Sequence, residues 1–406
     1  MKIAFFSDCF LDLTGGIVTS ISAQKEELEN RGHTVYVFSS SYPKSKAETA
    51  KLKKENIFPV KSCRLIGRGL SPIARRPRII EKQIMKEHPE IKDFDCFYVH
   101  YEAGCSIAGL RLGKKLGVKT IQVMHGREDI GEQNLVPYGL KTIVAILLNW
   151  FHSWYLPHHT KIKRDNYLAT TVAAAKMWTL MVNHANYADL VLTPSEHFKK
   201  KLLHYGVKKP FKTLPNGILD KNFISNLTPR ALKSGEEMKI IWHSRVSAEK
   251  RILPFLQALT KVEGKYRLNV YGDGNDLRRA QNFAKKYHLN VHFHGVKGFK
   301  TVYPEIVKSH LDVLISYNFD NYPMTLIEAE SAGTPVLFVD PDMSEVVPKA
   351  GSILTKGPNS DDIAAALNDL MSHPEKIQQM SRAMLAHRDE VRISNIINKL
   401  ERYIKS

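Results

Sequence analysis

The sequence is poor in cysteine, lacks long apolar runs and has fewer acidic than basic residues. Its four cysteines lie at irregular spacings without a CxxC pair, at Cys9, Cys63, Cys96 and Cys105. This pattern argues against a disulfide framework or a metal centre and favours a reducing cytoplasm. No apolar run reaches the roughly 18 residues that a membrane-spanning helix needs. The opening segment MKIAFFSDCF turns polar too early for a signal peptide and predicts a strand. We therefore expect a protein that does not cross a membrane, although it can lie on one.

The most unusual feature of the composition is its excess of basic over acidic residues. The chain has 59 Lys and Arg residues against 41 Asp and Glu residues, a formal net charge of +18. Such an excess implies an anionic partner, which composition leaves open between nucleic acid, an acidic membrane surface and a phosphorylated substrate. No recognised nucleic-acid module is present, and the aromatic residues cluster with aliphatic ones, so nucleic acid is the disfavoured partner.

The length and the hydrophobic pattern predict two α/β domains. A chain of 406 residues exceeds the usual size of one domain. Strand-like runs recur in both halves: KIAFFS, HTVYVFSS, CFYVHY, KTIQVMH and DLVLTP, then MKIIWHS, YRLNVYG, VHFHG, LDVLIS and TPVLFVD. Separated by helical stretches, they predict parallel sheets built from βαβ units. We place an N-terminal domain at 1–224, a polar linker at 225–238 and a C-terminal domain at 239–406, whose last helix can pack back on the first domain. We expect a cleft between the domains, with ligands at the carboxyl ends of the strands.

Glycine and basic residues follow several of the predicted strands. Gly15 and Gly16 lie where the first strand turns into a helix, whose N-terminus favours an anion, although a tight turn explains them equally well. After MKIIWHS, Arg245 and Lys250 suit the spread charge of a diphosphate. A solvated loop of a basic protein is the alternative for that pair. The glycines of VYGDGNDL give a weaker glycine-loop signal.

The segment SYNFDNYPMTLIEAESAGTPV, residues 316–336, joins a polar loop to a predicted buried helix. Thr325 lies at the start of that helix, where free N–H groups and the helix dipole favour a phosphate. Glu328 lies one turn further and can accept two ribose hydroxyls, while Asp320 in the loop can meet another polar part of the ligand. Each of these residues, taken alone, has a simpler explanation: an acidic first turn that complements the helix dipole without binding a ligand. Three such sites at matching strand ends favour the ligand.

Taken together, these motifs resemble a family 4 retaining glycosyltransferase of the GT-B fold. The landmarks follow the order of that family and cover nearly the whole chain. They are Gly15 and Gly16, His125-Gly126, Pro194-Ser195, Pro215-Asn216-Gly217, Ser244-Arg245 with Glu249-Lys250, and Asp320, Glu328-Ala329 and Gly333-Thr334-Pro335-Val336 for acid-x7-acid leading into EA-x3-G-x-PV. The resemblance implies two Rossmann-like domains whose parallel sheets face a central cleft.

The resemblance also implies roles for single residues. Arg245 and Lys250 would hold the donor diphosphate and stabilise the leaving group. Glu328 would bind the ribose, Asp320 would contact the hydroxyls of the transferred sugar, and His125 would lie near that sugar. Further donor contacts are expected from Gly16, Tyr322, Met324 and Thr325. Such enzymes use a nucleotide sugar without a metal or other cofactor, and they retain configuration by front-face attack within an ion pair.

Three positions depart from the family pattern. Asp320 replaces the usual Glu and is one methylene shorter. Pro323 replaces a glycine and has no N–H to give a phosphate, and Ser244 replaces the glycine before the basic turn. Each change can shift sugar preference or weaken catalysis, but none removes a charged group.

Two segments of the first domain predict contact with a lipid surface. SPIARRPRIIEKQIMKEH predicts a basic amphipathic helix through Arg75, Arg78 and Lys82, with a solvated helix packed on its own sheet as the alternative. In LKTIVAILLNWFHSWYLPHHTKIKR, Trp150 and Trp154 stand between an aliphatic run and a basic tail, which is typical of an interfacial anchor. This layout resembles the bacterial diacylglycerol glucosyltransferases.

The sequence thus predicts a retaining hexosyltransferase that lies on the inner, cytoplasmic face of the cell membrane. The expected donor is UDP-glucose, the expected acceptor is 1,2-diacylglycerol or a related glycolipid, and the product bond is α. Two alternatives stay open. One is a polyprenyl-linked, wall-polymer or protein acceptor, and the other is a catalytically weak glycosyltransferase-like partner subunit.

Overall fold

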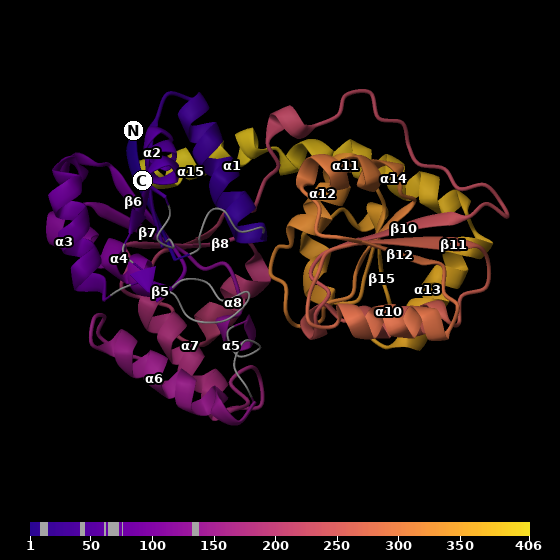
Figure 1. Ribbon diagram of the computed structural model, residues 1–406, viewed down its shortest axis with the longest axis horizontal. Helices are drawn as coiled ribbons and strands as arrows, with labels where there is room; N and C mark the ends of the chain where they lie inside the picture. Colours follow the sequence, from indigo (N-terminus) through magenta and orange to yellow (C-terminus); the bar gives the residue numbers. More distant parts are fainter. Residues whose placement is uncertain (9–14, 41–44, 61, 64–72, 75, 132–137) are drawn as a thin grey trace. The chain divides into compact units, whose positions relative to one another are not determined.

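The protein folds into two compact α/β units (Figure 1). The computed structural model describes residues 1–8, 15–40, 45–60, 62–63, 73–74, 76–131 and 138–406. Unit 1 comprises Met1–Pro215 together with Ile396–Ser406, and unit 2 comprises Asn216–Asn395. The predicted linker, 225–238, lies within unit 2, where Leu232 joins the hydrophobic core.

Unit 1 is built on a parallel sheet of seven strands in the order β3-β2-β1-β6-β7-β8-β9. The strands are β1 Lys2–Ser7, β2 Thr34–Ser40, β3 Ile57–Val60, β6 Cys96–His100, β7 Lys119–Val123, β8 Leu190–Thr193 and β9 Phe211–Thr213. A short antiparallel pair joins β4 Ser62–Cys63 to β5 Ile73–Ala74. All five strands predicted for the first half are present, and the parallel pairing is confirmed.

The helices of unit 1 cover this sheet. They are α1 Gly16–Asn30, α2 Lys46–Lys54, α3 Pro77–Glu87, α4 Gly104–Leu116, α5 Glu128–Gly131, α6 Lys141–Ser153, α7 Val172–Ala185 and α8 Glu196–His204. Helix α4 packs so closely that a Cβ on Gly109 would meet the Phe6 ring of β1 at 2.5 Å. Glycine at this position therefore sets the distance between the helix and the sheet.

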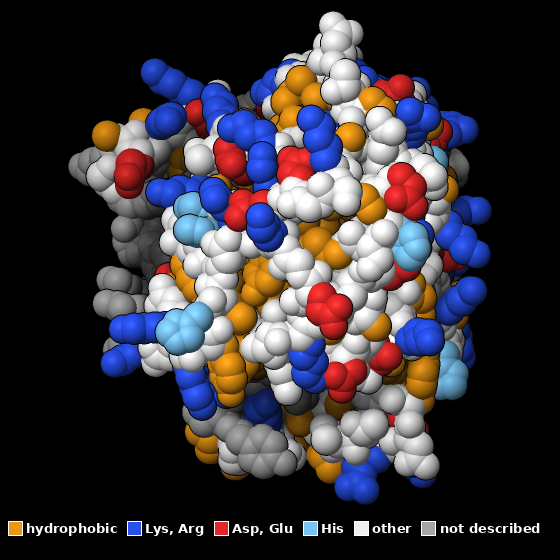
Figure 2. Space-filling model, turned by 90° about the vertical axis from the view of Figure 1, so that its right-hand side faces the viewer, with side chains coloured by type: hydrophobic (Ala, Val, Ile, Leu, Met, Phe, Trp, Pro, Cys, Tyr) orange, Lys and Arg blue, Asp and Glu red, His pale blue; other side chains and the backbone are white. Residues whose placement is uncertain are grey.

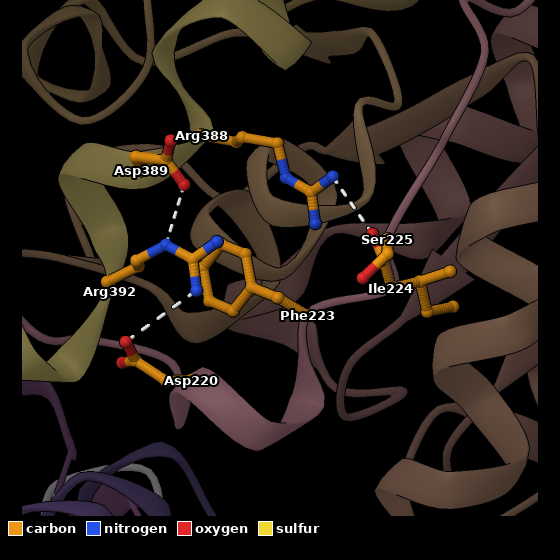
Figure 3. A pocket seen from close by; sticks show the side chains of 7 residues that line it. All are labelled: Asp220, Phe223, Ile224, Ser225, Arg388, Asp389 and Arg392. Atoms are coloured by element: carbon orange, nitrogen blue, oxygen red, sulfur yellow. Dashed lines mark hydrogen bonds and ion pairs between the residues drawn. The ribbon is translucent and has the colours of Figure 1, made fainter.

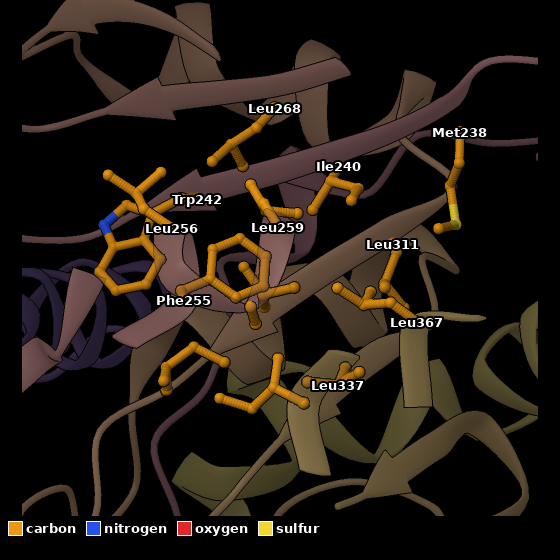
Figure 4. Packing of buried hydrophobic residues seen from close by; sticks show 14 of the residues in the cluster. Met238, Ile240, Trp242, Phe255, Leu256, Leu259, Leu268, Leu311, Leu337 and Leu367 are labelled. Carbon is orange, nitrogen blue, oxygen red and sulfur yellow. The ribbon is translucent and has the colours of Figure 1, made fainter. Parts of the chain in front are cut away.

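Unit 2 repeats the plan with six parallel strands in the order β12-β11-β10-β13-β14-β15. The strands are β10 Met238–His243, β11 Tyr266–Tyr271, β12 Val291–Gly295, β13 Leu311–Leu314, β14 Val336–Phe338 and β15 Ser352–Leu354. The helices are α9 Ile252–Leu259, α10 Leu277–Lys286, α11 Phe299–Lys308, α12 Met324–Ala332, α13 Ser360–Ser372 and α14 Glu375–His387. Figure 4 shows the core, in which Trp242 of β10 packs near Phe255 of α9 with ring centroids 6.2 Å apart.

The last helix, α15 Ile393–Lys405, returns the chain to unit 1. Its side chains meet the end of α1, since Glu401 lies 2.8 Å from the ring of His33 and 3.5 Å from Arg31. Lys119 of β7 donates to the carbonyl of Tyr403 at 3.0 Å. The C-terminal residues therefore belong to the N-terminal unit.

Candidate functional site

The order of the strands marks one place in each sheet where a ligand site is expected. In unit 2, β10 pairs with β11 on one side and with β13 on the other. Successive strands are therefore added on one side of β10 up to β12 and on its other side from β13 onward, so the strand order reverses between β10 and β13. Open parallel sheets bind ligands outside the carboxyl ends of the strands at such a switch point. The motifs predicted for the donor follow these two strands. The matching switch point of unit 1 lies between β1 and β6.

The basic turn after β10 holds one buried and one exposed cation. Lys250 is buried, and its Nζ lies 2.7 Å and 2.8 Å from the two carboxylate oxygens of Asp320. The hydroxyl of Ser316 also donates to Asp320. The Arg245 side chain is 62% exposed and lies 3.2 Å from Glu249. An ammonium has three donors, so Lys250 keeps at least one for a further acceptor beside its carboxylate partner.

Two glycines hold this turn in place. A Cβ on Gly272 would lie 2.1 Å from the carbonyl oxygen of Ser244, and one on Gly274 would lie 2.3 Å from that of Val246. Val246 donates its N–H to the carbonyl of Asp273 at 3.0 Å and accepts from Asp276 at 3.0 Å. The glycines of VYGDGNDL therefore let two loop backbones touch. Ser244 itself has no positive φ, so its backbone does not require the glycine that the family pattern places there.

We expect Gly274→Ala to displace the basic turn. A Cβ 2.3 Å from a backbone oxygen cannot be accommodated without moving one of the two loops. Overpacking of this kind costs about 1–3 kcal/mol of unfolding free energy. Thermal unfolding should show the loss as a lower midpoint temperature. Gly298→Ala is the matched control, because a Cβ there meets no atom within 4 Å. Unchanged stability of Gly274→Ala would contradict this account of the loop.

Helix α12 begins where the sequence predicts, with Met324 as its first residue and Pro323 as its N-cap. The first N–H groups of a helix have no intrahelical acceptor and favour an anion. The hydroxyl of Thr325 is buried and has no hydrogen-bond partner among the described residues. The Met324 side chain packs in the core, and the carbonyl of Tyr322 accepts from Asn216 at 3.0 Å. These contacts fix the loop that leads into the helix.

Glu328 is held by a histidine that sequence reasoning missed. His243, the last residue of β10, lies between two carboxylates: its Nδ1 is 3.3 Å from Glu328, and its Nε2 is 2.6 Å from Asp312 of β13. Burial lowers the pKa of His243, but the carboxylates of Asp312 and Glu328 outweigh it and raise the pKa to about 10. His243 is therefore a cation at neutral pH. An aspartate inside the apolar run LDVLIS was the available signal, because a buried carboxylate requires a partner.

We expect the contribution of His243 to stability to depend on pH. The folded pKa of about 10 lies above the ordinary value of 6.5, so the stabilisation is complete below pH 6.5 and is lost as the pH rises through 10. Removing one partner of a buried ion pair costs about 3 kcal/mol. Urea unfolding of the wild type and His243→Gln should therefore differ most at pH 6.5 or below, and less as the pH rises through 10. A difference that stays constant over this range would contradict the charged state.

The residues predicted in unit 1 lie near its own switch point. Gly15 caps α1, which starts at Gly16. His125 follows β7, with its Nε2 2.8 Å from Nδ1 of His100 and the two rings stacked at 5.1 Å. Burial lowers the pKa of His125 to about 3, so this imidazole is neutral. Asp8, at the end of β1, accepts from the N–H groups of Cys105 and Ala103 and thereby caps α4.

The comparisons with known proteins decide the family. Residues 14–220 match the profile of Glycosyltransferase Family 4, and residues 225–385 match that of Glycosyl transferases group 1. The chain belongs to glycosyltransferase family 4. Its two units are the Rossmann-like domains of the GT-B fold, as the resemblance implied.

This family 4 glycosyltransferase is similar to curated proteins that act on lipids. It is 24% identical to the alpha-monoglucosyldiacylglycerol synthase of Streptococcus pneumoniae over 83% of this chain and 70% of that protein. The synthase of Acholeplasma laidlawii is 21% identical over 94% and 91% of the two chains. The lipopolysaccharide 1,6-galactosyltransferase of Escherichia coli is 30% identical over 39% of this chain, and the match spans less than half (45%) of that protein.

Solved structures show the same fold. HepE from Anabaena in complex with UDP superposes over 100% of both chains with a TM-score of 0.68 and 15% identity. A TarM structure from S. aureus in complex with UDP covers 100% of both chains with a TM-score of 0.71 and 12% identity. At these identities the likeness establishes the fold alone.

The basic helix and the aromatic segment of this glycosyltransferase differ in their surfaces. On α3, Arg78 and Lys82 are exposed, whereas Ile80 and Ile84 are buried in the core of unit 1. Ile80 and Ile84 therefore pack on the domain itself, and the exposed face of α3 carries its basic side chains beside Ile79, which is 38% exposed. Arg75 lies outside the described residues.

Helix α6, by contrast, presents an apolar stripe to solvent. The exposed fractions run from 43% to 56% for Ile143, Ile146, Leu147, Trp150 and Trp154. The two tryptophan rings lie against each other with centroids 4.1 Å apart. Lys161, Lys163 and Arg164 follow and are exposed. Unit 2 differs on the face that Figure 2 shows, where basic side chains mix with acidic ones and with scattered apolar groups. In the part of the chain that the structure describes, no helix is long and apolar enough to span a bilayer.

A cavity of about 290 Å³ lies apart from the donor motifs, where the chain enters and leaves unit 2 (Figure 3). The guanidinium groups of Arg388 and Arg392 lie 5.0 Å and 4.1 Å from the Phe223 ring. Asp389 and Asp220 pair with Arg392. Arg388 instead donates to the backbone carbonyl of Ile224 at 3.1 Å. Because these contacts tie the residues after α14 to the segment around Phe223, we assign the cluster a structural role in joining the two crossing segments.

Proposed function

We propose that this glycosyltransferase moves glucose from UDP-glucose to a diacylglycerol-type lipid with retention of configuration. The observation that carries the proposal is the gathering of a buried lysine, two carboxylates and a helix N-terminus at the switch point between β10 and β13. This combination offers cations for a diphosphate and acceptors for sugar hydroxyls. It matches the motif roles that the family resemblance implies.

In the proposed mechanism the nucleotide end of the donor binds in unit 2. Lys250 and Arg245 compensate the charge that develops on the diphosphate as the glycosidic bond breaks. The N–H groups at the start of α12 and the hydroxyl of Thr325 complete the phosphate site. Glu328 accepts the ribose hydroxyls. Two protein cations supply the positive charge, so the proposal requires no metal.

The transferred sugar is handled by Asp320 and His125 in this proposal. Asp320 accepts from sugar hydroxyls and is oriented by Lys250 and Ser316. His125 is neutral and can exchange a hydrogen bond with the sugar without placing a second cation there. The acceptor hydroxyl attacks from the face that the diphosphate leaves and gives its proton to the leaving oxygen. The anomeric configuration is thereby retained.

A lipid acceptor agrees with the surface of unit 1. The stripe on α6 exposes two tryptophans, a residue type that is enriched at membrane–water interfaces. Exposed basic residues follow the stripe in the chain. Each Lys or Arg near an anionic surface contributes about 1 kcal/mol of binding. The relatives named as monoglucosyldiacylglycerol synthases point to the same acceptor class. We place the protein peripherally on the inner face of the cell membrane.

The experiment that tests the proposed function is UDP release from a donor and acceptor panel. The donors are UDP-glucose, UDP-galactose and UDP-N-acetylglucosamine, and the acceptors are diacylglycerol, monoglucosyldiacylglycerol and a polyprenyl phosphate in mixed vesicles. We expect fastest release with UDP-glucose and diacylglycerol. Release that requires the polyprenyl phosphate, or release at the same rate without any acceptor, would overturn the assignment of diacylglycerol as the acceptor.

A further inference from the structure

The side chains of His243, Asp312 and Glu328 form a continuous chain from the sheet interior to the donor site. The His243 side chain is 5% exposed, and that of Asp312 is 2% exposed. Asp312 comes from β13, His243 ends the neighbouring strand β10, and Glu328 lies one turn into α12. Sequence reasoning assigned a role to Glu328 alone.

The contacts fix the protonation of the ring. Nε2 lies 2.6 Å from one carboxylate and Nδ1 lies 3.3 Å from the other. A carboxylate only accepts, so both ring nitrogens must carry a proton to satisfy both partners. Asp312 from β13 and Glu328 from α12 are the charged groups that act on this ring among the described residues. The ring is therefore an imidazolium between two anions.

We infer that His243 is a positioning residue that holds Glu328 through Oε2 and turns its other carboxylate oxygen toward the ribose of the nucleotide sugar. This inference rests on the proposed function, since it deepens the role given there to Glu328. The imidazolium occupies Oε2 of Glu328, and the described residues place no hydrogen-bond donor on Oε1. The Glu328 side chain remains 14% exposed. Oε1 is therefore the oxygen that is available to a ligand.

The consequence is selectivity for ribose over deoxyribose. A Glu328 side chain that is held through Oε2 presents Oε1 as an acceptor to the 2′- and 3′-hydroxyls, and removal of the 2′-hydroxyl takes away one donor to it. An unanchored carboxylate would also have to be ordered by the nucleotide on binding. The chain Asp312–His243–Glu328 thus prepares a hydroxyl acceptor before the donor arrives.

The experiment compares UDP and 2′-deoxy-UDP by calorimetry in four variants. His243→Phe/Asp312→Leu removes the cation without leaving Asp312 buried and unpaired. Asp312→Leu alone keeps His243 against Glu328. His243→Gln retains one neutral donor. His294→Phe is the control on strand β12, which is separated from β10 by β11 and where the residue is exposed. Thermal unfolding establishes which variants are folded before binding is measured, and His243→Gln carries the test if the double variant does not fold.

We expect the double variant to bind UDP about tenfold more weakly, the size of one hydrogen bond to a charged group. Its preference for UDP over 2′-deoxy-UDP should fall close to unity, with His243→Gln in between. Asp312→Leu and His294→Phe should keep the wild-type preference. A folded variant without His243 that keeps the wild-type preference would overturn the inference alone. A wild type that binds no UDP would overturn the proposed function and this inference with it.

Discussion

Replacing Lys250 by alanine is expected to slow sugar transfer by about two to three orders of magnitude. The ammonium is buried beside Asp320 and is the cation placed to meet the leaving diphosphate in our proposal. Removing one preorganised charge from a site of this kind lowers kcat by about 10²–10³-fold. The rate of UDP release at saturating UDP-glucose and diacylglycerol is the measurement. The loss should fall on kcat more than on KM, because the negative charge grows as the bond breaks.

Two variants separate this effect from damage to the fold. Lys250→Ala leaves Asp320 without its cation, so Lys250→Ala/Asp320→Asn is measured as well. Lys261→Ala is the matched control, since Lys261 is exposed and its ammonium contacts the exposed Asp361 and the hydroxyl of Ser360. We expect wild-type turnover from the control and turnover about 10²–10³-fold lower from the other two. Turnover close to wild type in a folded Lys250→Ala would remove the central residue of the proposed site.

Charging the apolar stripe of α6 is expected to detach the protein from lipid vesicles. Trp150→Glu/Trp154→Glu replaces two exposed indoles by carboxylates that an anionic surface repels. Burying an aromatic side chain contributes about 1.5–3 kcal/mol, so the double variant should lose at least 100-fold in vesicle affinity. Sedimentation with phosphatidylglycerol vesicles measures it. The wild type should bind these more tightly than phosphatidylcholine vesicles, because exposed Lys and Arg residues follow the stripe.

The control for this prediction is Tyr287→Glu, which charges an exposed aromatic residue at the end of α10 in unit 2. It should leave vesicle binding unchanged, and both variants should bind UDP like the wild type. If the double variant still sediments with the vesicles, the α6 stripe is not the membrane contact. Equal binding of the wild type to both lipid compositions would refute the contribution of the exposed Lys and Arg residues to membrane binding.

The sequence predicted the strands well because they are buried on both faces. Runs such as KIAFFS and LDVLIS are nearly continuous in apolar residues, and all ten predicted strands are present. The strands of the two large sheets that were missed, β3, β9 and β15, are short and lie at the edges of their sheets, and the two-residue strands β4 and β5 were missed as well. Half-buried strands of three or four residues carry too little pattern to stand out from loops.

The predicted site was partly visible in the sequence and partly not. The spacing of Asp320 and Glu328 placed one in the loop and the other one turn into α12, where the structure has them. The contact between Lys250 and Asp320 spans 70 residues and depends on β10 and β13 being neighbours. His243 could not be assigned for the same reason, since its partners lie on other elements. The glycines of VYGDGNDL allow loop packing in the structure, a role that no local pattern distinguishes from ligand approach.

The most direct test of the account is the identity and configuration of the transferred sugar. UDP-glucose labelled with ¹³C at the anomeric carbon is incubated with the protein and vesicles that contain diacylglycerol, and the lipid product is examined by NMR. The account predicts a single glucosyl-diacylglycerol whose anomeric coupling is that of an α-glycoside. A β-glycoside, or labelled glucose in solution with none on the lipid, would contradict it.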